Sequence, residues 1–390
     1  MNYFLKKINI CFILFFSIIT NFIVIYANDD SLDLGLLSKS YILMEEDTGK
    51  ILLEKNSHEQ LPPASVTKIM TLLLIFEAIE DGKIKLEDNV IVSEYAASMG
   101  GSQVFLEPNE TQTVKDMIKC IAIASANDAS VAMAEYVGGS EENFVKMMND
   151  KAKELGMNET NFLNACGLDK EGHLTSAFDI AIMSRELVKN YPEIKEYSTI
   201  WQDTIIHKTR NGESEFGLSN TNKLIKWYDK ATGLKTGSTN KALYCLSGTA
   251  ENDELKLIAV VMAAPDNNIR FSEVIKLFDY GFTNYNIESI GKKGDIVSEI
   301  PIYKGNRNTV TGIIDKDINI IAKKGNNINV KTEVEIPPGL TAPINQGEKI
   351  GEIIYKIDDK EETRCNIIAD YSVDKINVFQ MILKLFSLWC

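Results

Sequence analysis

Two residues at the start of one apolar segment could carry out covalent chemistry together. The tetrad S-x-x-K that runs from Ser65 to Lys68 follows Pro-Pro-Ala, a helix-entry signal, and opens a run that predicts a helix. Both side chains then share one helical face, near an N-terminus that favours negative charge. A lysine buried there has a lowered pKa and can act as a base on the serine. The pattern suits a nucleophilic serine at position 65 with Lys68 as its base.

The tetrad alone is weak evidence, because S-x-x-K occurs four times in the chain, starting at Ser65, Ser238, Ser289 and Ser372. Only the first copy begins an apolar helix, where the lysine would lose its water and with it part of its basicity. The surroundings of Ser65 therefore suit a nucleophile better than those of the other three serines.

Two further motifs follow in a fixed order. Ser125-Ala126-Asn127 lies in an apolar run, where by itself it favours a hydrogen-bonding site between helices. Lys235-Thr236-Gly237 leads into a β-rich run, where it would suit a carboxylate beside an edge strand or, alternatively, form a surface turn. S-x-x-K, then S-x-N, then K-T-G is the set found in β-lactamases and penicillin-binding proteins.

The elements that must position these motifs come from two regions of different periodicity. Residues 35–285 mix strand-like and helix-like segments, which predicts a mixed α/β domain with a helical insert. Hairpins are expected from Ser40–Met44 with Ile51–Leu53, at a sheet edge, and from Leu243–Ala250 with Leu255–Ala263. Helices are expected over Ser65–Ile79, Lys115–Val137, Phe144–Leu155 and Ser272–Tyr280.

From about residue 287 the hydrophobic period changes to two, as in the alternating residues 328–336, and glycines mark the turns. This pattern predicts a small β-sandwich, in which we see no residues that could carry chemistry. The expected fold class is α+β: a catalytic domain with a helical subdomain, then a small all-β domain and a C-terminal amphipathic helix. The expected boundaries are 28–285 for the catalytic domain, 286–372 for the β domain and 373–390 for the helix.

Both ends of the chain suggest a membrane. Residues 1–27 begin with two lysines, continue as an apolar stretch and end in Ala27, which predicts a signal peptide; an uncleaved membrane helix is the alternative. In 373–390 the polar positions 374, 377, 380, 384 and 387 fall on one helical stripe. This predicts a helix lying in the membrane interface, with docking on the protein's own core as the alternative.

Composition excludes several classes of protein. The chain has 390 residues, of which 45% are hydrophobic and 25% charged, which suits a folded protein of two or three domains. Its net charge of −14 argues against nucleic-acid binding. The three histidines are far apart and no C-x-x-C occurs, so we expect no metal site and no cofactor. Cys120 and Cys245 are expected to be buried, although one disulfide remains open.

Longer segments resemble the low-molecular-mass penicillin-binding proteins that are serine-type D-alanyl-D-alanine carboxypeptidases. The resemblance rests on the three motifs together with Leu61–Thr71, Met99–Ser102, Thr175–Asp179 and Asp279–Phe282. It implies removal of the terminal D-alanine from peptidoglycan pentapeptide stems, with β-lactams as inhibitors that acylate the same serine. It also implies an exported protein on the outer face of the bacterial cytoplasmic membrane, held to the membrane surface by the C-terminal helix.

The resemblance implies a role for each residue of the catalytic motifs. Ser65 would attack the carbonyl between two D-alanines, and Lys68 would take its proton. Ser125 would relay a proton to the leaving D-alanine. The backbone N–H groups of Ser65 and Ser238 would form the oxyanion hole.

The remaining residues would bind the substrate. Asn127 would contact the peptide, and Gly237 would let the backbone of the K-T-G strand come close. Lys235 and Thr236, together with Arg270, would hold the terminal carboxylate.

Three other functions have weaker support in the sequence. A β-lactamase of class A would need a glutamate in an E-x-x-L-N loop, and the segment from Glu159 to Asn164 has one residue too many. A catalytically idle wall-binding protein would not need both Ser65 and Lys68. A nucleophilic pair of Cys166 and His173 has no accompanying oxyanion signal.

Overall fold

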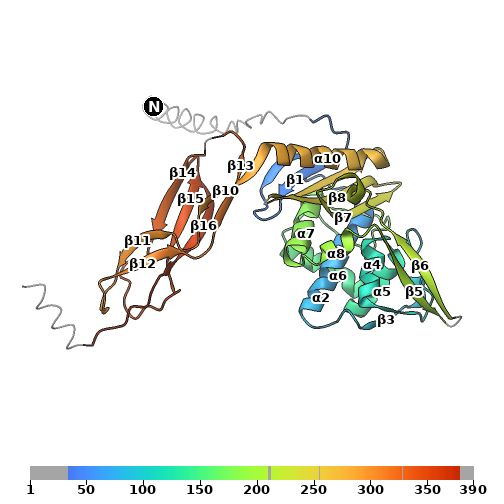
Figure 1. Ribbon diagram of the computed structural model, residues 1–390. Helices are drawn as coiled ribbons and strands as arrows, with labels where there is room; N and C mark the ends of the chain where they lie inside the picture. Colours follow the sequence, from blue (N-terminus) through green and yellow to red (C-terminus); the bar gives the residue numbers. More distant parts are fainter. Residues whose placement is uncertain (1–33, 210–211, 254, 327, 378–390) are drawn as a thin grey trace, which may run out of the picture. The chain divides into compact units, whose positions relative to one another are not determined.

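The structure is a computed structural model that describes residues 34–209, 212–253, 255–326 and 328–377. Within these ranges all helices lie before residue 285, and the chain that follows α10 (Asn267–Asn284) is built from strands (Figure 1). The predicted signal peptide and residues 378–390 of the predicted C-terminal helix lie outside these ranges. The described part therefore agrees with an α+β domain followed by an all-β domain.

A five-stranded antiparallel sheet forms the centre of the first domain. Its order is β2-β1-β9-β8-β7, so β2 and β7 are its two edges. The strands are β1 (Ser40–Glu45), β2 (Ile51–Lys55), β7 (Ala231–Thr239), β8 (Leu243–Asn252) and β9 (Leu255–Ala264). Both predicted hairpins are confirmed, because β1 pairs with β2 and β8 pairs with β9.

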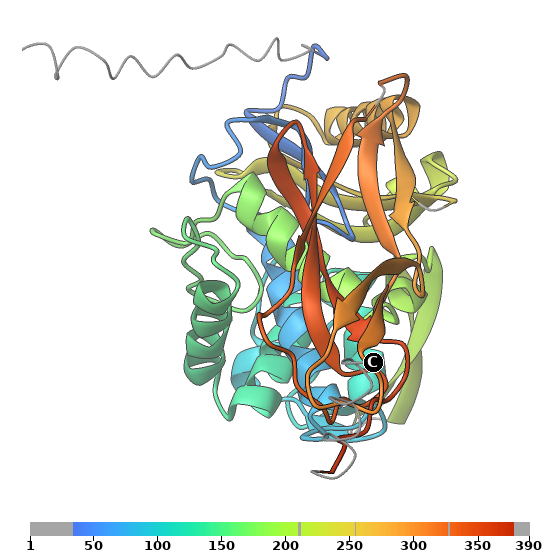
Figure 2. The ribbon, with the colours of Figure 1, turned by 90° about the vertical axis from the view of Figure 1, so that its left-hand side faces the viewer.

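Helices cover both faces of this sheet. α10 lies along one face and α7 (Ala177–Asn190) lies along the other (Figures 1 and 2). β9 is buried over most of its length, as expected for a central strand between two helical layers. α10 begins at Asn267, earlier than the predicted start at Ser272, because the Asp266 side chain caps it by accepting from the N–H of Asn268.

A helical subdomain surrounds α2 (Lys68–Glu80). Ten of the thirteen residues of α2 are buried, and a helix that is apolar on most sides must be enclosed by other elements. It packs most extensively against α7, then against α5 (Asn127–Gly138) and α4 (Val114–Ala122), and less against α6 (Glu141–Glu154). The shorter elements are η1 (Ala64–Thr67), α3 (Glu94–Ala97), α8 (Ile194–Ser198), α9 (Leu224–Trp227), the pair β3 (Asn89–Ile91) and β4 (Thr111–Thr113), and the hairpin β5 (Gln202–Thr209) and β6 (Gly212–Ser219).

The prediction of one continuous helix over Lys115–Val137 is wrong. The segment forms α4 and α5, with residues 123–126 between them. Ser125 has a φ of +60°, in the left-handed region that a right-handed helix cannot accommodate. The N–H of Asn127 donates to the carbonyl of Ser102 at 2.7 Å rather than to the preceding turn. Periodicity could not show this break, because the apolar residues on both sides of it are buried in the same core.

The second domain is all β, as the change of period predicted. Its strands are β10 (Tyr285–Gly291), β11 (Ile296–Pro301), β12 (Thr309–Ile314), β13 (Ile318–Lys323), β14 (Val330–Glu335), β15 (Lys349–Ile357) and β16 (Lys360–Ala369). They form a two-stranded sheet β10-β13 and a five-stranded sheet β11-β12-β16-β15-β14, which share one apolar core. The alternation at 328–336 does give a strand, β14, but this strand lies at a sheet edge and is mostly exposed.

The predicted C-terminal helix cannot begin at residue 373. Val373 is buried and forms an antiparallel bridge with Ile344, and Lys375 forms another with Gly305. Residues 373–377 are thus extended and belong to the β domain. In the described ranges, no helix is long and apolar enough to cross a membrane. The four cysteines described there are free and buried, including Cys120 and Cys245 as expected.

A loop at residues 164–168 packs closely on η1, the turn that carries Ser65. Gly167 in this loop has a φ of +86°, and a Cβ atom there would lie 1.9 Å from the carbonyl oxygen of Ala64. Because that oxygen belongs to the backbone, it cannot move aside as a flexible side chain could. Only glycine allows the loop and the nucleophile turn to come this close.

Replacement of Gly167 by alanine should destabilise the fold through this contact. We expect Gly167→Ala to lower the free energy of unfolding by about 2–5 kcal/mol, from left-handed strain plus overpacking. Gly172→Ala is the matched control, because Gly172 has a similar φ of +84° but its nearest atom to a Cβ is 3.7 Å away. The control should lose about 1–2 kcal/mol in denaturant unfolding. Equal losses in the two variants would contradict the contact.

Candidate active site

Ser65 and Lys68 lie together as the tetrad predicted. Ser65 is in η1 and Lys68 is the first residue of α2, and the Lys68 Nζ donates a hydrogen bond to Ser65 Oγ at 3.0 Å. The ammonium group is fully buried, with no exposed surface. A serine hydroxyl in contact with a buried amine is the arrangement that activates a nucleophile.

Three oxygen atoms surround the Lys68 Nζ. Besides Ser65 Oγ, it donates to Asn127 Oδ1 at 2.6 Å and to the carbonyl of Cys166 at 2.6 Å. An ammonium group has three donors, so these contacts satisfy it completely. Burial lowers the pKa of Lys68 to about 8, with smaller opposing effects of Cys166 and Asp128. The neutral amine is therefore accessible close to neutral pH.

Asn127 reaches the site because of the break between α4 and α5, and Ser125 lies within that break. Both are buried, each with 3% of its surface exposed. Asn127 contacts Lys68 through Oδ1, and its Nδ2 donates to the carbonyl of Gly100 at 2.6 Å. The same turn is held by Asp128, whose carboxylate accepts the N–H groups of Val104 and Leu106. Asn127 of the second motif thus contacts Lys68 of the first. The predicted continuous helix over Lys115–Val137 gave no reason to expect this contact.

β7 brings the third motif alongside the nucleophile turn. A Cβ atom on Gly237 would lie 2.7 Å from the carbonyl oxygen of Pro63 and 3.0 Å from the backbone nitrogen of Ser65. Thr236 is buried, and its hydroxyl lies 2.7 Å from that of Thr221. Ser238, which follows Gly237, is exposed. Since β7 is an edge strand, its outer side can face a ligand at Ser65.

Lys235 adds a second buried cation. Its side chain is 1% exposed and its Nζ donates to the carbonyl of Thr236 at 3.1 Å. Burial, followed by the positive charges of Lys68 and Arg270, holds the pKa of Lys235 well below its usual range. An anion bound beside Lys235 would relieve both the lost hydration and the repulsion.

Arg270 lies against the K-T-G strand rather than at its open edge. Its Nη1 donates to the carbonyls of Gly237 at 3.0 Å and Cys245 at 3.3 Å, and its Nη2 donates to Asn267 Oδ1 at 2.6 Å. Burial lowers its pKa to about 10. The guanidinium therefore braces β7 and β8 and adds positive charge to the site.

Cys166 and His173 do not form a nucleophilic pair. His173 Nδ1 accepts from the N–H of Leu163 at 3.1 Å, so its Nε2 carries the proton and donates to Thr67 Oγ1 at 2.9 Å. Burial lowers the pKa of His173 to about 4 and raises the pKa of the Cys166 thiol. Both groups are thus neutral, and the histidine has no lone pair left for a thiol.

Sequence reasoning missed one feature of this site, the Cys166 carbonyl that accepts from Lys68. Every residue has such a carbonyl, so no residue type signals it.

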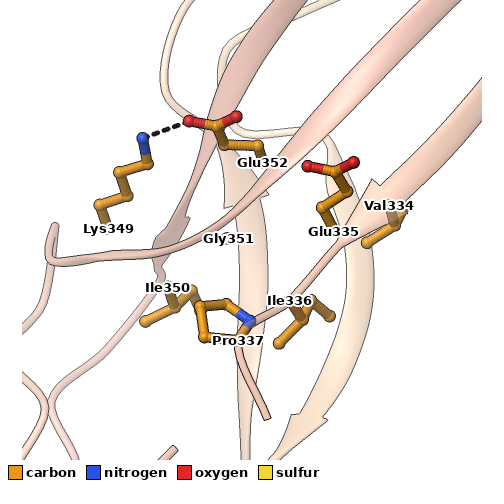
Figure 3. Close-up of a pocket in the computed structure, with 8 residues that line it drawn as sticks. All are labelled: Val334, Glu335, Ile336, Pro337, Lys349, Ile350, Gly351 and Glu352. Atoms are coloured by element: carbon orange, nitrogen blue, oxygen red, sulfur yellow. Dashed lines mark hydrogen bonds and ion pairs between the residues drawn. The ribbon is translucent and has the colours of Figure 1, made fainter.

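The β domain offers a surface groove between β14 and β15, lined by Val334, Ile336, Pro337 and Ile350 with a Lys349–Glu352 ion pair at its rim (Figure 3). These side chains include no nucleophile and base pair, so the catalytic candidates remain those around Ser65.

Comparison with protein families decides where the chain belongs. Residues 28–266 match the family model described as D-alanyl-D-alanine carboxypeptidase. The chain is a member of this family. Residues 285–375 match the C-terminal domain of penicillin-binding protein 5, which agrees with the β domain. The predicted resemblance and the α+β fold class are confirmed.

Individual relatives agree with the family. The chain is 44% identical over 353 residues to the D-alanyl-D-alanine carboxypeptidase DacF of Bacillus subtilis (strain 168), covering 90% of each chain. It is 33% identical to DacC of Escherichia coli (strain K12), over 88% of this chain and 86% of the relative. Penicillin binding protein 5 from Haemophilus influenzae has a similar structure, with a TM-score of 0.74, 31% identity and coverage of 87% and 98%.

The titration of Lys68 in this carboxypeptidase-family protein can be measured directly. In spectra of protein with ¹³C-labelled lysine, we expect the ε-carbon resonance that is absent from Lys68→Met to titrate near pH 8. The protonated form should dominate below this pH and the neutral form above it. The midpoint is lower than that of an exposed lysine because burial disfavours the charged state. Surface lysines, with pKa values near about 10.4, serve as internal controls. Titration of Lys68 together with them would contradict its buried position.

Proposed function

We propose that this protein is a serine-type D-alanyl-D-alanine carboxypeptidase that removes the terminal D-alanine from peptidoglycan pentapeptide stems. The observation that carries the proposal is the buried Lys68 amine at 3.0 Å from Ser65 Oγ, on the scaffold of this family. The proposed reaction needs no metal or other cofactor, because the nucleophile, the base and the anion-binding groups are side chains and backbone N–H groups of the chain itself.

The first step forms an acyl-enzyme on Ser65. Neutral Lys68 takes the hydroxyl proton while Ser65 Oγ attacks the carbonyl between the two D-alanines. The carbonyl oxygen, on which negative charge develops, accepts hydrogen bonds from the backbone N–H groups of Ser65 and Ser238. The close packing of β7 on the nucleophile turn supports this oxyanion hole. A Cβ atom added to Gly237 would lie only 3.0 Å from the Ser65 nitrogen, so the strand lies directly beside the nucleophile.

The leaving D-alanine must gain a proton as the peptide bond breaks. Ser125 supplies it, and recovers a proton from the Lys68 ammonium formed in the first step. The proposed relay is supported by the burial of Ser125 and by its place two residues before Asn127, which itself contacts Lys68. Water then attacks the ester and Lys68 takes its proton. Lys68 returns this proton to Ser65 Oγ as the bond between the acyl carbon and Oγ breaks, which releases the shortened stem and regenerates Ser65.

The positively charged side chains of the site would bind the terminal carboxylate of the stem. Lys235 and Thr236 on β7 bind it, and Asn127 contacts the peptide side. Arg270 supports this binding indirectly. Its buried guanidinium donates to the Gly237 carbonyl of β7 and adds positive charge to the site. β-Lactams carry a similar carboxylate beside a strained amide, so they acylate Ser65 by the same first step.

Replacement of Ser65 by alanine tests the nucleophile. We expect Ser65→Ala to abolish penicillin labelling and to reduce D-alanine release from a diacylated L-Lys-D-Ala-D-Ala peptide by about 10³-fold or more. Ser289→Ala is the matched control, because Ser289 begins another S-x-x-K copy on an exposed position of β10. The control should keep full labelling. Stoichiometric labelling of Ser65→Ala would refute the nucleophile assignment.

We also propose that the protein is exported and held on the outer face of the bacterial cytoplasmic membrane by residues 378–390, the part of the predicted helix that follows the extended residues 373–377. The apolar N-terminal stretch and the polar stripe near the C-terminus support this location. The acidic chain would be repelled by anionic lipids, so its attachment must come from apolar insertion.

A truncation designed on the β domain tests this attachment. Removal of residues 378–390 leaves Val373 and its bridge to Ile344 intact, whereas a cut at 373 would remove a buried residue. We expect the chain 28–377, which lacks the apolar N-terminal stretch, to stay in solution while the chain 28–390 floats with phosphatidylglycerol–phosphatidylethanolamine vesicles. Unfolding of the two chains at the same temperature is the control for folding. Flotation of both chains to the same extent would overturn the anchor.

A further inference from the structure

The carbonyl of Cys166 is one of three acceptors of the Lys68 ammonium group, and a backbone carbonyl is only as well placed as its loop. The loop at 164–168 has no regular secondary structure that could fix the orientation of this peptide group. Some other interaction must therefore hold the oxygen at 2.6 Å from the Lys68 Nζ.

The side chain of Asn164 makes the hydrogen bonds that fix this loop. Its Oδ1 accepts from the N–H groups of Cys166 at 3.2 Å, Gly167 at 2.6 Å and Leu168 at 3.2 Å. Its Nδ2 donates to the carbonyl of Leu168 at 2.9 Å. One amide thus binds four backbone groups, and these bracket the peptide group whose oxygen faces Lys68.

The start of the loop is held independently. The Ala165 N–H donates to Glu141 Oε1 at 3.0 Å, and the Ala165 carbonyl accepts from Thr71 Oγ1 at 2.6 Å. These contacts fix the Ala165 backbone to α6 and α2. Loss of Asn164 would leave them in place but would free the next peptide group, that of Cys166, to turn away from Lys68.

We propose that Asn164 is a positioning residue for the reaction, which holds the Cys166 carbonyl on Lys68 and thereby keeps the amine on Ser65 Oγ. The inference rests on the proposed function. Asn164 itself touches neither substrate nor reacting atoms, so its removal should slow acylation without weakening substrate binding. Misplacement of a catalytic base by about 1 Å can reduce the rate by about 10²-fold.

The pH profile gives a second readout. A carbonyl that accepts from an ammonium group favours the charged form, so its loss lowers the pKa of Lys68 further. The rise of the acylation rate with pH should then shift to lower pH. A general loosening of the fold would not move this midpoint in a defined direction.

The test uses the full-length protein in detergent with four forms: wild type, Asn164→Ala, Asn164→Asp and Asn161→Ala. Asn164→Asp keeps the oxygen that accepts the three N–H groups. Asn161→Ala is the matched control in the same segment, because Asn161 Nδ2 donates to the carbonyl of Gly172, at 2.8 Å, which lies outside the loop at 164–168. Acylation by benzylpenicillin and D-alanine release are measured from pH 5 to pH 10, with thermal unfolding in parallel.

We expect Asn164→Ala to lose about 10–100-fold in kcat and in the limiting acylation rate, with KM changed less than about threefold and the midpoint shifted to lower pH. Asn164→Asp should stay within about fivefold of wild type, and Asn161→Ala should match it. An inert wild type would refute the proposed function instead.

With an active wild type, three results would overturn the positioning role: an unchanged Asn164→Ala, a loss confined to KM, or an equal loss in Asn161→Ala. If Asn164→Ala does not fold, the same criteria apply to Asn164→Ser. Its shorter side chain has one acceptor oxygen in place of the amide.

Discussion

The burial of the Lys68 amine is the constraint on which the rest of the structure depends. A charged amine without water is costly unless all its donors find acceptors. Lys68 finds them on three separate segments: the turn η1, the start of α5 and the loop at 164–168. The same burial brings its pKa to about 8, so one arrangement both ties the segments together and prepares a base.

Two local departures from regular structure make this convergence possible. The helix that periodicity predicts over Lys115–Val137 has to break at Ser125, because only a new helix start places Asn127 on Lys68. β7 has to approach η1 until Gly237 is in backbone contact with Pro63 and Ser65, where a larger residue would not fit. Positive charge from Lys235 and Arg270 then gathers beside the nucleophile, which suits a substrate that ends in a carboxylate.

The sequence predicted what local spacing determines. Ser65 and Lys68 are one helical turn apart, so their contact follows from the tetrad. The two predicted hairpins, β1–β2 and β8–β9, follow from alternation and turns. The contact between Asn127 and Lys68 joins residues 59 positions apart and depends on the break at Ser125, which no periodicity reveals. The Cys166 carbonyl and its support by Asn164 were missed because backbone groups leave no pattern in residue types. The prediction that a helix begins at residue 373 is wrong, because Val373 is apolar enough to suit either a helix or a β-bridge and pairs with Ile344.

The most direct test of the account is a mass-spectrometric time course of the protein with benzylpenicillin, run beside D-alanine release from a diacylated L-Lys-D-Ala-D-Ala peptide. The account predicts a long-lived adduct that maps to the peptide containing Ser65, together with release of D-alanine. A transient adduct with rapid penicillin hydrolysis and no D-alanine would instead indicate a β-lactamase. Absence of both adduct and D-alanine would contradict an acyl-transfer enzyme altogether.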